Sequence, residues 1–167
     1  MFVIYNFFLS LIIFISPLII LIRILLGKED QNRFKEKYGF LAKNNNSKEV
    51  VWIHGASVGE ILSIIPIVKK FEKDKKIKRI LITSSTTSSS QILSKFRFKK
   101  IIHQFYPFDL NFLTKHFINH WKPKLAIFVD SEIWPNMFNN LHKQNIPLIL
   151  LNARITKKSF NRWKLFP

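Results

Sequence analysis

Residues Val50 to Glu60 read VVWIHGASVGE, the pattern that says most about how this chain folds. Five residues that suit a buried strand lead into a turn of small residues, and the turn leads into the start of a helix. We expect this strand to belong to a parallel sheet, with Glu60 just past its carboxyl end. Open α/β sheets bind their ligands at that edge, so Glu60 is the first candidate for a functional residue.

Strand and helix patterns alternate through the rest of the chain. Strands are predicted at Val50–His54, Arg79–Thr83, Ile101–Phe105, Leu125–Val129 and Pro147–Leu151, and helices at Val58–Phe71, Ser89–Phe96, from Asp109 as N-cap to about His120, Pro135–Gln144 and Lys157–Phe166. Short, almost wholly apolar strands are typical of a parallel sheet covered on both faces. The pattern therefore predicts an α/β domain over residues 50–167.

The N-terminal segment is apolar, and its first charged side chain is Arg23. A run of this length can cross a bilayer as a helix, which needs about 20 apolar residues. It lacks the basic start and small-residue cleavage site of a signal peptide, so we expect a retained anchor over 1–26 and a polar juxtamembrane helix and loop over 27–49. Basic residues follow the run and none precedes it, which predicts a cytoplasmic domain and suggests a lipid-borne substrate.

The chain is strongly basic. Its 167 residues include 27 Lys and Arg against 10 Asp and Glu, a formal net charge of +17. Such a balance favours a phosphorylated substrate, an acidic membrane surface or nucleic acid as partner, although the Lys-, Ile-, Asn- and Phe-rich composition of AT-rich coding DNA explains it equally well. The densest basic run, 69–79, is expected at the end of the sheet opposite Glu60, where a solvated helix terminus explains it most simply.

The composition argues against disulfide bonds and against a metal site. There is no cysteine, which excludes disulfides and thiolate metal sites. The five histidines show no HExxH pattern. We therefore expect no metal site.

Ser57 and Glu60 have the spacing of a capping box, and that structural role explains them on spacing alone. The small residues Gly55 and Gly59, however, leave the turn open to a substrate. A carboxylate at such a turn can act as a general base once a hydroxyl docks beside it. Both roles stay open on the residues alone.

Two further segments follow predicted strands. Asp130-Ser131-Glu132 forms either a turn with solvated acids or, with Trp134, part of a pocket. The hydroxyl-rich segment Thr83–Ser89 offers donors for a phosphate or sugar, although a polar loop that caps a helix is the simpler interpretation. This segment contains no glycine and is therefore neither a P-loop nor a dinucleotide fingerprint.

Five segments together resemble the N-terminal half of the bacterial 3-deoxy-D-manno-octulosonic acid (Kdo) transferases of lipopolysaccharide synthesis. They are, in chain order, Arg33–Gly39 (RFKEKYG), Trp52–Glu60 (WIHGASVGE), Tyr106–Asp109 (YPFD), Glu132–Asn136 (EIWPN) and Asn152–Arg154 (NAR). They follow an N-terminal anchor, as in the family. The resemblance implies a GT-B glycosyltransferase, whose N-terminal Rossmann-like domain binds the lipid acceptor and whose C-terminal domain binds CMP-Kdo.

By this resemblance, Glu60 is the general base that deprotonates an acceptor hydroxyl of the lipid A precursor, and the hydroxyl displaces CMP with inversion. No metal or other cofactor is implied. An arginine suits the Kdo carboxylate or an acceptor phosphate. The positions that match the family's substrate-binding motifs are Gly55, Ser57, Gly59, Asp130, Glu132 and Arg154.

The chain also departs from the family. Asp130 stands where the family has a glutamate, and Ser89 where it has a glycine. We expect the family's donor-binding half to be missing, and therefore expect an inner-membrane acceptor-binding half that needs a partner half for transfer. Two alternatives remain: a half-enzyme that only binds lipid or a partner, and a basic nucleic-acid-binding module. The apolar anchor argues against nucleic acid as a partner, and so does the basic run, which is not rich in aromatic residues.

Overall fold

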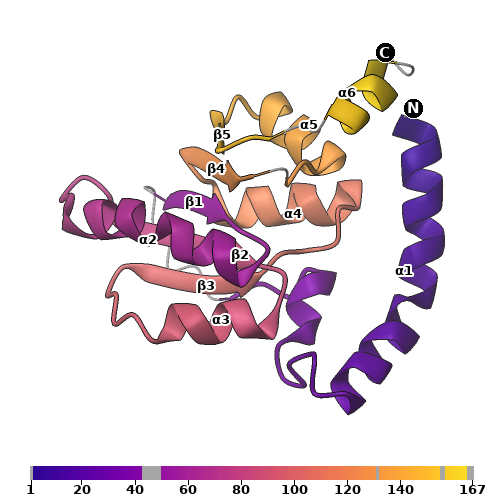
Figure 1. Ribbon diagram of the computed structural model, residues 1–167, viewed down its shortest axis with the longest axis horizontal. Helices are drawn as coiled ribbons and strands as arrows, with labels where there is room; N and C mark the ends of the chain where they lie inside the picture. The colour runs from indigo at the N-terminus through magenta and orange to yellow at the C-terminus, as the bar shows by residue number, and fades with distance from the viewer. Residues whose placement is uncertain (1, 43–49, 131, 155–156, 165–167) are drawn as a thin grey trace.

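The computed structural model describes residues 2–42, 50–130, 132–154 and 157–164. Its centre is one parallel sheet in the order β3-β2-β1-β4-β5 (Figure 1). The strands are β1 Val50–His54, β2 Arg79–Ser84, β3 Ile101–Phe105, β4 Leu125–Val129 and β5 Leu148–Leu151. The predicted parallel α/β sheet is confirmed.

Helices cover both faces of the sheet, as predicted. Alternate strand residues point to opposite faces, and each face carries its own apolar core. Val51 and Ile53 of β1 pack on α2 (Val58–Lys73) and α3 (Thr87–Ser94). Trp52 of β1 packs instead with residues of α4 and α5. The bounds of the remaining helices are α4 Asn111–Trp121, α5 Pro135–Lys143 and α6 Lys157–Lys164.

The strand order reverses its direction between β1 and β4. The chain winds outward from β1 through β2 to β3, and then crosses back to place β4 on the other side of β1. The loops that follow β1 and β4 therefore leave the sheet in opposite directions, and open α/β sheets bind their ligands at such a point. Glu60 follows β1 and Glu132 follows β4.

The predicted role of Asp109 as the N-cap of the next helix is wrong. Helix α4 begins at Asn111 and has Leu110 at its N-cap position. The Asp109 carboxylate instead accepts backbone N–H bonds from Asn136 (2.9 Å) and Met137 (2.8 Å), in the first turn of α5. That helix has no capping side chain of its own, so an acid from a distant loop satisfies its free N–H groups.

Helix α3 begins earlier than the predicted Ser89 because Thr86 caps it. The Thr86 hydroxyl accepts a bond from the Ser89 backbone N–H, at 3.2 Å. The helix consequently starts at Thr87. Several hydroxyl residues in a row can each serve as a cap, and their order alone does not select one.

Part of the juxtamembrane segment packs against the edge of the sheet. A short 3-10 helix, η1 (Phe34–Tyr38), lies beside the edge strand β3. The Glu36 carboxylate accepts the Phe105 N–H (2.7 Å), and the Arg33 guanidinium donates to the His103 carbonyl (3.0 Å). These side chains occupy backbone groups that an edge strand leaves unpaired. The expected loop over 43–49 lies outside the described residues.

The apolar N-terminal segment forms α1 (Phe2–Leu25), which runs beside the domain (Figure 1). It is long and apolar enough to cross a membrane by length and composition. Only Ser16 and Ile20 are buried among its described side chains. The Tyr5 hydroxyl donates to Asp109 (2.7 Å), and the Asn6 side chain accepts from the Asn136 amide (2.7 Å).

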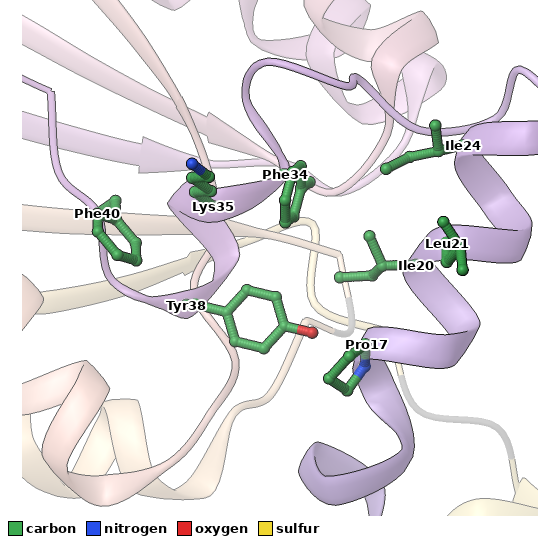
Figure 2. A pocket seen from close by; sticks show the side chains of 8 residues that line it. All are labelled: Pro17, Ile20, Leu21, Ile24, Phe34, Lys35, Tyr38 and Phe40. Atoms are coloured by element: carbon green, nitrogen blue, oxygen red, sulfur yellow. The ribbon is translucent and has the colours of Figure 1, made fainter.

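A cavity of about 500 Å³ lies between α1 and η1 (Figure 2). The side chains around it are almost all apolar, and the Lys35 ammonium is the one charge among them. None of the predicted site residues contributes to this cavity. Its lining consists of Pro17, Ile20, Leu21, Ile24, Phe34, Lys35, Tyr38 and Phe40.

Candidate functional site

Glu60 is held firmly at the carboxyl edge of the sheet. Ser57 is the N-cap of α2, and its hydroxyl accepts the Glu60 backbone N–H at 3.3 Å. The Glu60 carboxylate accepts the Ala56 N–H at Oε2 and the Ser57 hydroxyl at Oε1, both at 2.7 Å. The predicted capping interaction is thus present, but the carboxylate reaches the N–H of Ala56 rather than that of Ser57. One oxygen is fixed by the backbone, and the other meets a hydroxyl that can rotate.

The two glycines of the turn have different surroundings. Gly55 is buried, and a Cβ there would lie 3.2 Å from the Glu60 Cβ, tighter than ordinary contact. Gly59 is exposed, and a Cβ there would approach nothing closer than the Ser57 hydroxyl, at 3.9 Å. Gly55 is therefore needed for close packing of the turn, whereas a side chain at Gly59 would meet open space apart from the Ser57 hydroxyl.

The hydroxyl-rich loop braces this turn and does not present an open array of donors. Ser89 is buried, and its hydroxyl donates to the Ala56 carbonyl at 3.2 Å. The Ser85 backbone N–H reaches the same carbonyl at 3.3 Å. Ser84 is also buried and pairs with His103. This arrangement favours the structural interpretation of the loop over a phosphate site.

Glu132 lies past the end of β4, the strand next to β1. Its Oε2 accepts the Trp134 indole N–H at 3.0 Å and lies 3.5 Å from His54 Nε2. The neighbouring His54 lowers the pKa of the Glu132 carboxyl, partial burial raises it, and the Trp134 N–H lowers it again, with a net decrease. Glu132 is therefore a carboxylate at neutral pH.

His54 belongs to this site, although the sequence patterns did not single it out. It is fully buried at the end of β1, and its Nδ1 lies 2.9 Å from the Thr83 hydroxyl on β2. Its ring packs against Tyr106, with 4.1 Å between centroids. The available signal was a histidine closing an otherwise apolar strand, on the same face as Trp52.

Asp130 and Arg154 meet through a residue at the end of β5. The Asn152 amide donates to Asp130 at 2.5 Å, and the Arg154 Nη2 donates to the Asn152 side-chain oxygen at 3.3 Å. Asp130 and Asn152 both have left-handed backbones, with φ of 57° and 54°. Asp130, Asn152 and Arg154 thus form a cluster where β4 and β5 end.

Comparison with known proteins identifies the family. The family described as 3-deoxy-D-manno-octulosonic-acid transferase (Kdo transferase) matches residues 32–167. The chain belongs to this family. The match starts just before η1, so it includes the segment that covers β3.

Several transferases of this name are similar over nearly the whole chain. The transferase of Rickettsia bellii is 42% identical over 96% of this chain and 38% of its own length. That of Haemophilus influenzae is 32% identical over 94% of this chain and 38% of its own. A probable mitochondrial transferase of Arabidopsis thaliana is 34% identical over 96% of this chain and 36% of its own. The chain thus spans about two fifths of the length of these relatives.

Proposed function

We propose that this chain is the acceptor-binding half of a Kdo transferase that moves Kdo from CMP-Kdo to a lipid A precursor in lipopolysaccharide core synthesis. Family membership supports the reaction, and the reversal of strand order between β1 and β4 supports the place where it occurs. The observation that carries the proposal is the geometry of Glu60. Its carboxylate stands at the ligand-binding edge with Oε2 fixed by a backbone N–H and Oε1 against the Ser57 hydroxyl.

Glu60 acts as the general base in this proposal. The Ser57 hydroxyl turns away from Oε1, and an acceptor hydroxyl takes its place. As that hydroxyl oxygen bonds to the anomeric carbon of Kdo, the bond from this carbon to the CMP phosphate breaks, and the hydroxyl proton passes to Glu60. Attack opposite the leaving CMP inverts the anomeric centre. The open space beside Gly59 gives the acceptor its approach.

The other site residues bind the substrates or stabilise the charge that develops during transfer. Glu132, ionised at neutral pH, can stabilise positive charge that develops on the sugar as CMP leaves. Arg154, held through Asn152 beside Asp130, suits the Kdo carboxylate or an acceptor phosphate. The step as proposed needs no metal or other cofactor.

We also propose that α1 anchors the domain to the inner membrane in a single pass, with the domain in the cytoplasm. The basic residues that follow α1 support this orientation. Roughly 27 Å of helix separates Tyr5 from Arg23 at 1.5 Å per residue. A spanning α1 would therefore carry Tyr5 and Asn6 across the bilayer, so their bonds to Asp109 and Asn136 must open on insertion.

The reaction is tested with this chain alone and with a chimera that joins it to the remaining C-terminal part of the Rickettsia bellii transferase. Each receives labelled CMP-Kdo and the lipid A precursor in detergent. We expect transfer by the chimera and none by the 167-residue chain, because holding both substrates together contributes up to about 7–11 kcal/mol. Transfer by the chain alone would contradict the division into halves. Acceptor binding without transfer by the chimera would favour the half-enzyme that only binds lipid.

A further inference from the structure

Three side chains on β1 and β2 form a buried hydrogen-bonded row. Trp52 and His54 point to the same face of β1, and Thr83 lies beside His54 on β2. The Thr83 hydroxyl oxygen is 2.9 Å from the Trp52 Nε1 and 2.9 Å from the His54 Nδ1. All three residues are fully buried. Neither Glu60 nor Glu132 belongs to this row. The hydrogen bonds of the row nevertheless determine what the His54 ring presents to Glu132.

The hydrogen bonds in this row determine which nitrogen of the His54 imidazole carries the proton. An indole N–H only donates, so Trp52 donates to the Thr83 oxygen. The Thr83 proton then has one nearby acceptor among the described residues, the Nδ1 of His54. If Nδ1 carried the proton instead, the buried Thr83 hydroxyl would lack an acceptor, which costs free energy. The neutral imidazole therefore carries its proton on Nε2.

The protonated Nε2 is aimed at Glu132. It is buried and has no hydrogen-bond partner among the described residues. It lies 3.5 Å from the Glu132 Oε2, just beyond hydrogen-bond length. Glu132 is only partly buried and follows the end of its strand, so a small shift of its side chain completes the bond. Buried polar groups are rarely left unpaired, which favours that shift when substrate binds at this edge of the sheet.

We propose that His54 is a positioning residue, which the Trp52–Thr83 pair locks in its Nε2–H form so that it orients Glu132 and keeps it ionised. The catalytic meaning of this inference rests on the proposed function, but the orientation does not. Tyr106 is the other titratable group packed against the ring, and burial raises its pKa, so it stays neutral. Glu132 is the charged partner that His54 faces.

The test is NMR on the full 167-residue chain in detergent, with labelled histidine nitrogens and glutamate carboxyls. We expect the neutral His54 ring to carry its proton on Nε2 and none on Nδ1. In His54→Phe the titration midpoint of Glu132 rises toward that of an exposed glutamate. In His54→Gln, which keeps an N–H donor near the Nε2 position, it stays low. Thr83→Val, but not Thr83→Ser, lets the second imidazole tautomer appear.

A proton on Nδ1 in the wild-type chain, or a Glu132 midpoint unchanged in His54→Phe, would overturn the inference. Backbone shifts of β1 and β2 identify any variant that fails to fold, and Thr83→Val and Thr83→Ser then serve as the test. In the chimera, His54→Phe should lower kcat with little change in KM, and His54→Gln should recover part of the loss. If the NMR results hold and no chimera transfers Kdo, the proposed function fails and the orientation of Glu132 stands.

Discussion

Ser57 and Glu60 combine a structural role with a chemical one, and the two can be separated. Ser57→Ala removes a helix cap, so we expect it to lower the free energy of unfolding by about 1 kcal/mol. Transfer by the chimera should fall little, because the Ala56 N–H still holds Glu60. Thr86→Ala is the matched control, since it removes the equivalent cap of α3. Denaturant unfolding and transfer rates measure both effects. A loss of transfer as large as that of a Glu60 variant would show that the hydroxyl itself takes part.

His103 should make the domain sensitive to acid. Burial, and then the nearby Arg33, lower its pKa to about 3. The unfolded chain, with a histidine pKa near 6.5, therefore binds a proton that the folded chain refuses. The free energy of unfolding should fall as pH drops from about 6.5 toward 3. His103→Gln should flatten this slope, as followed by urea unfolding at several pH values. Equal slopes in both proteins would assign the acid sensitivity to other groups.

The position of Glu60 after β1 and its capping interaction with Ser57 were predictable, because local spacing alone determines them. His54 and Asp109 were not, because their roles depend on partners far away in sequence. Asp109 looked like the cap of the next helix, yet it caps α5, whose first turn begins 26 residues later. Thr83 was correctly predicted to lie in a strand, but its bond to His54 in the neighbouring strand could not be predicted from local pattern.

The same distinction holds for the helices and strands. The strands were placed nearly to the residue, because a buried parallel strand is an apolar run with polar ends. The shape of η1 was not predictable, because its purpose is to cover the edge of β3, and which strand lies at an edge depends on the whole strand order. Gly39 marks its end with a left-handed backbone, and a Cβ there would lie 2.9 Å from Leu113.

Covering the edge of β3 should contribute measurably to stability. Glu36→Ala removes the acceptor for the Phe105 N–H and the partner of Arg33. We expect the free energy of unfolding to fall by about 1–3 kcal/mol, the cost of leaving a buried donor unpaired. Glu72→Ala is the control, since it too accepts backbone N–H bonds, at Lys99, but on an exposed loop. Equal losses of unfolding free energy in the two variants would show that covering the edge of β3 with η1 adds no particular stability.

The anchor can be tested with single cysteines, because the chain has none of its own. Val3→Cys lies at the exposed start of α1, and Ser88→Cys on the exposed surface of the domain. In intact cells a thiol reagent that cannot cross the inner membrane should label position 3 and not position 88. Lysed cells should label both. Absence of label at position 3 before lysis, with label after it, would mean that α1 stays docked on the domain and does not cross.

At the scale of the whole molecule, the charge of +17 should draw the acceptor to the domain. We expect the 167-residue chain to bind the bisphosphorylated lipid A precursor weakly and to lose affinity as salt rises, because the attraction is screened. Arg154→Gln should weaken binding, and Lys76→Gln, at the opposite end of the sheet, should not. Calorimetric titration in detergent measures both. Salt-sensitive binding to DNA or RNA, with none to the lipid, would favour the nucleic-acid module instead.

The overall architecture was predictable because alternating apolar strands and amphipathic helices allow few topologies. The arrangement of α1 was not, since its length and composition suit a bilayer as well as a groove beside the domain. The positions of Glu60, Glu132 and Arg154 past the ends of β1, β4 and β5 were predictable. The partners of their side chains were not, because those depend on how three loops leave three strands, which no local pattern encodes.

The single-turnover rate of Kdo transfer by the Glu60→Gln chimera tests the central claim most directly. Glutamine keeps the size of the side chain and an oxygen for the Ala56 N–H, but it cannot take a proton from the acceptor. We predict a rate about 10²–10⁴-fold below that of the unmodified chimera. The free energy of unfolding should change by no more than about 1 kcal/mol, the value of a cap. A near-normal rate in a less stable protein would contradict the account and leave Glu60 as a helix cap.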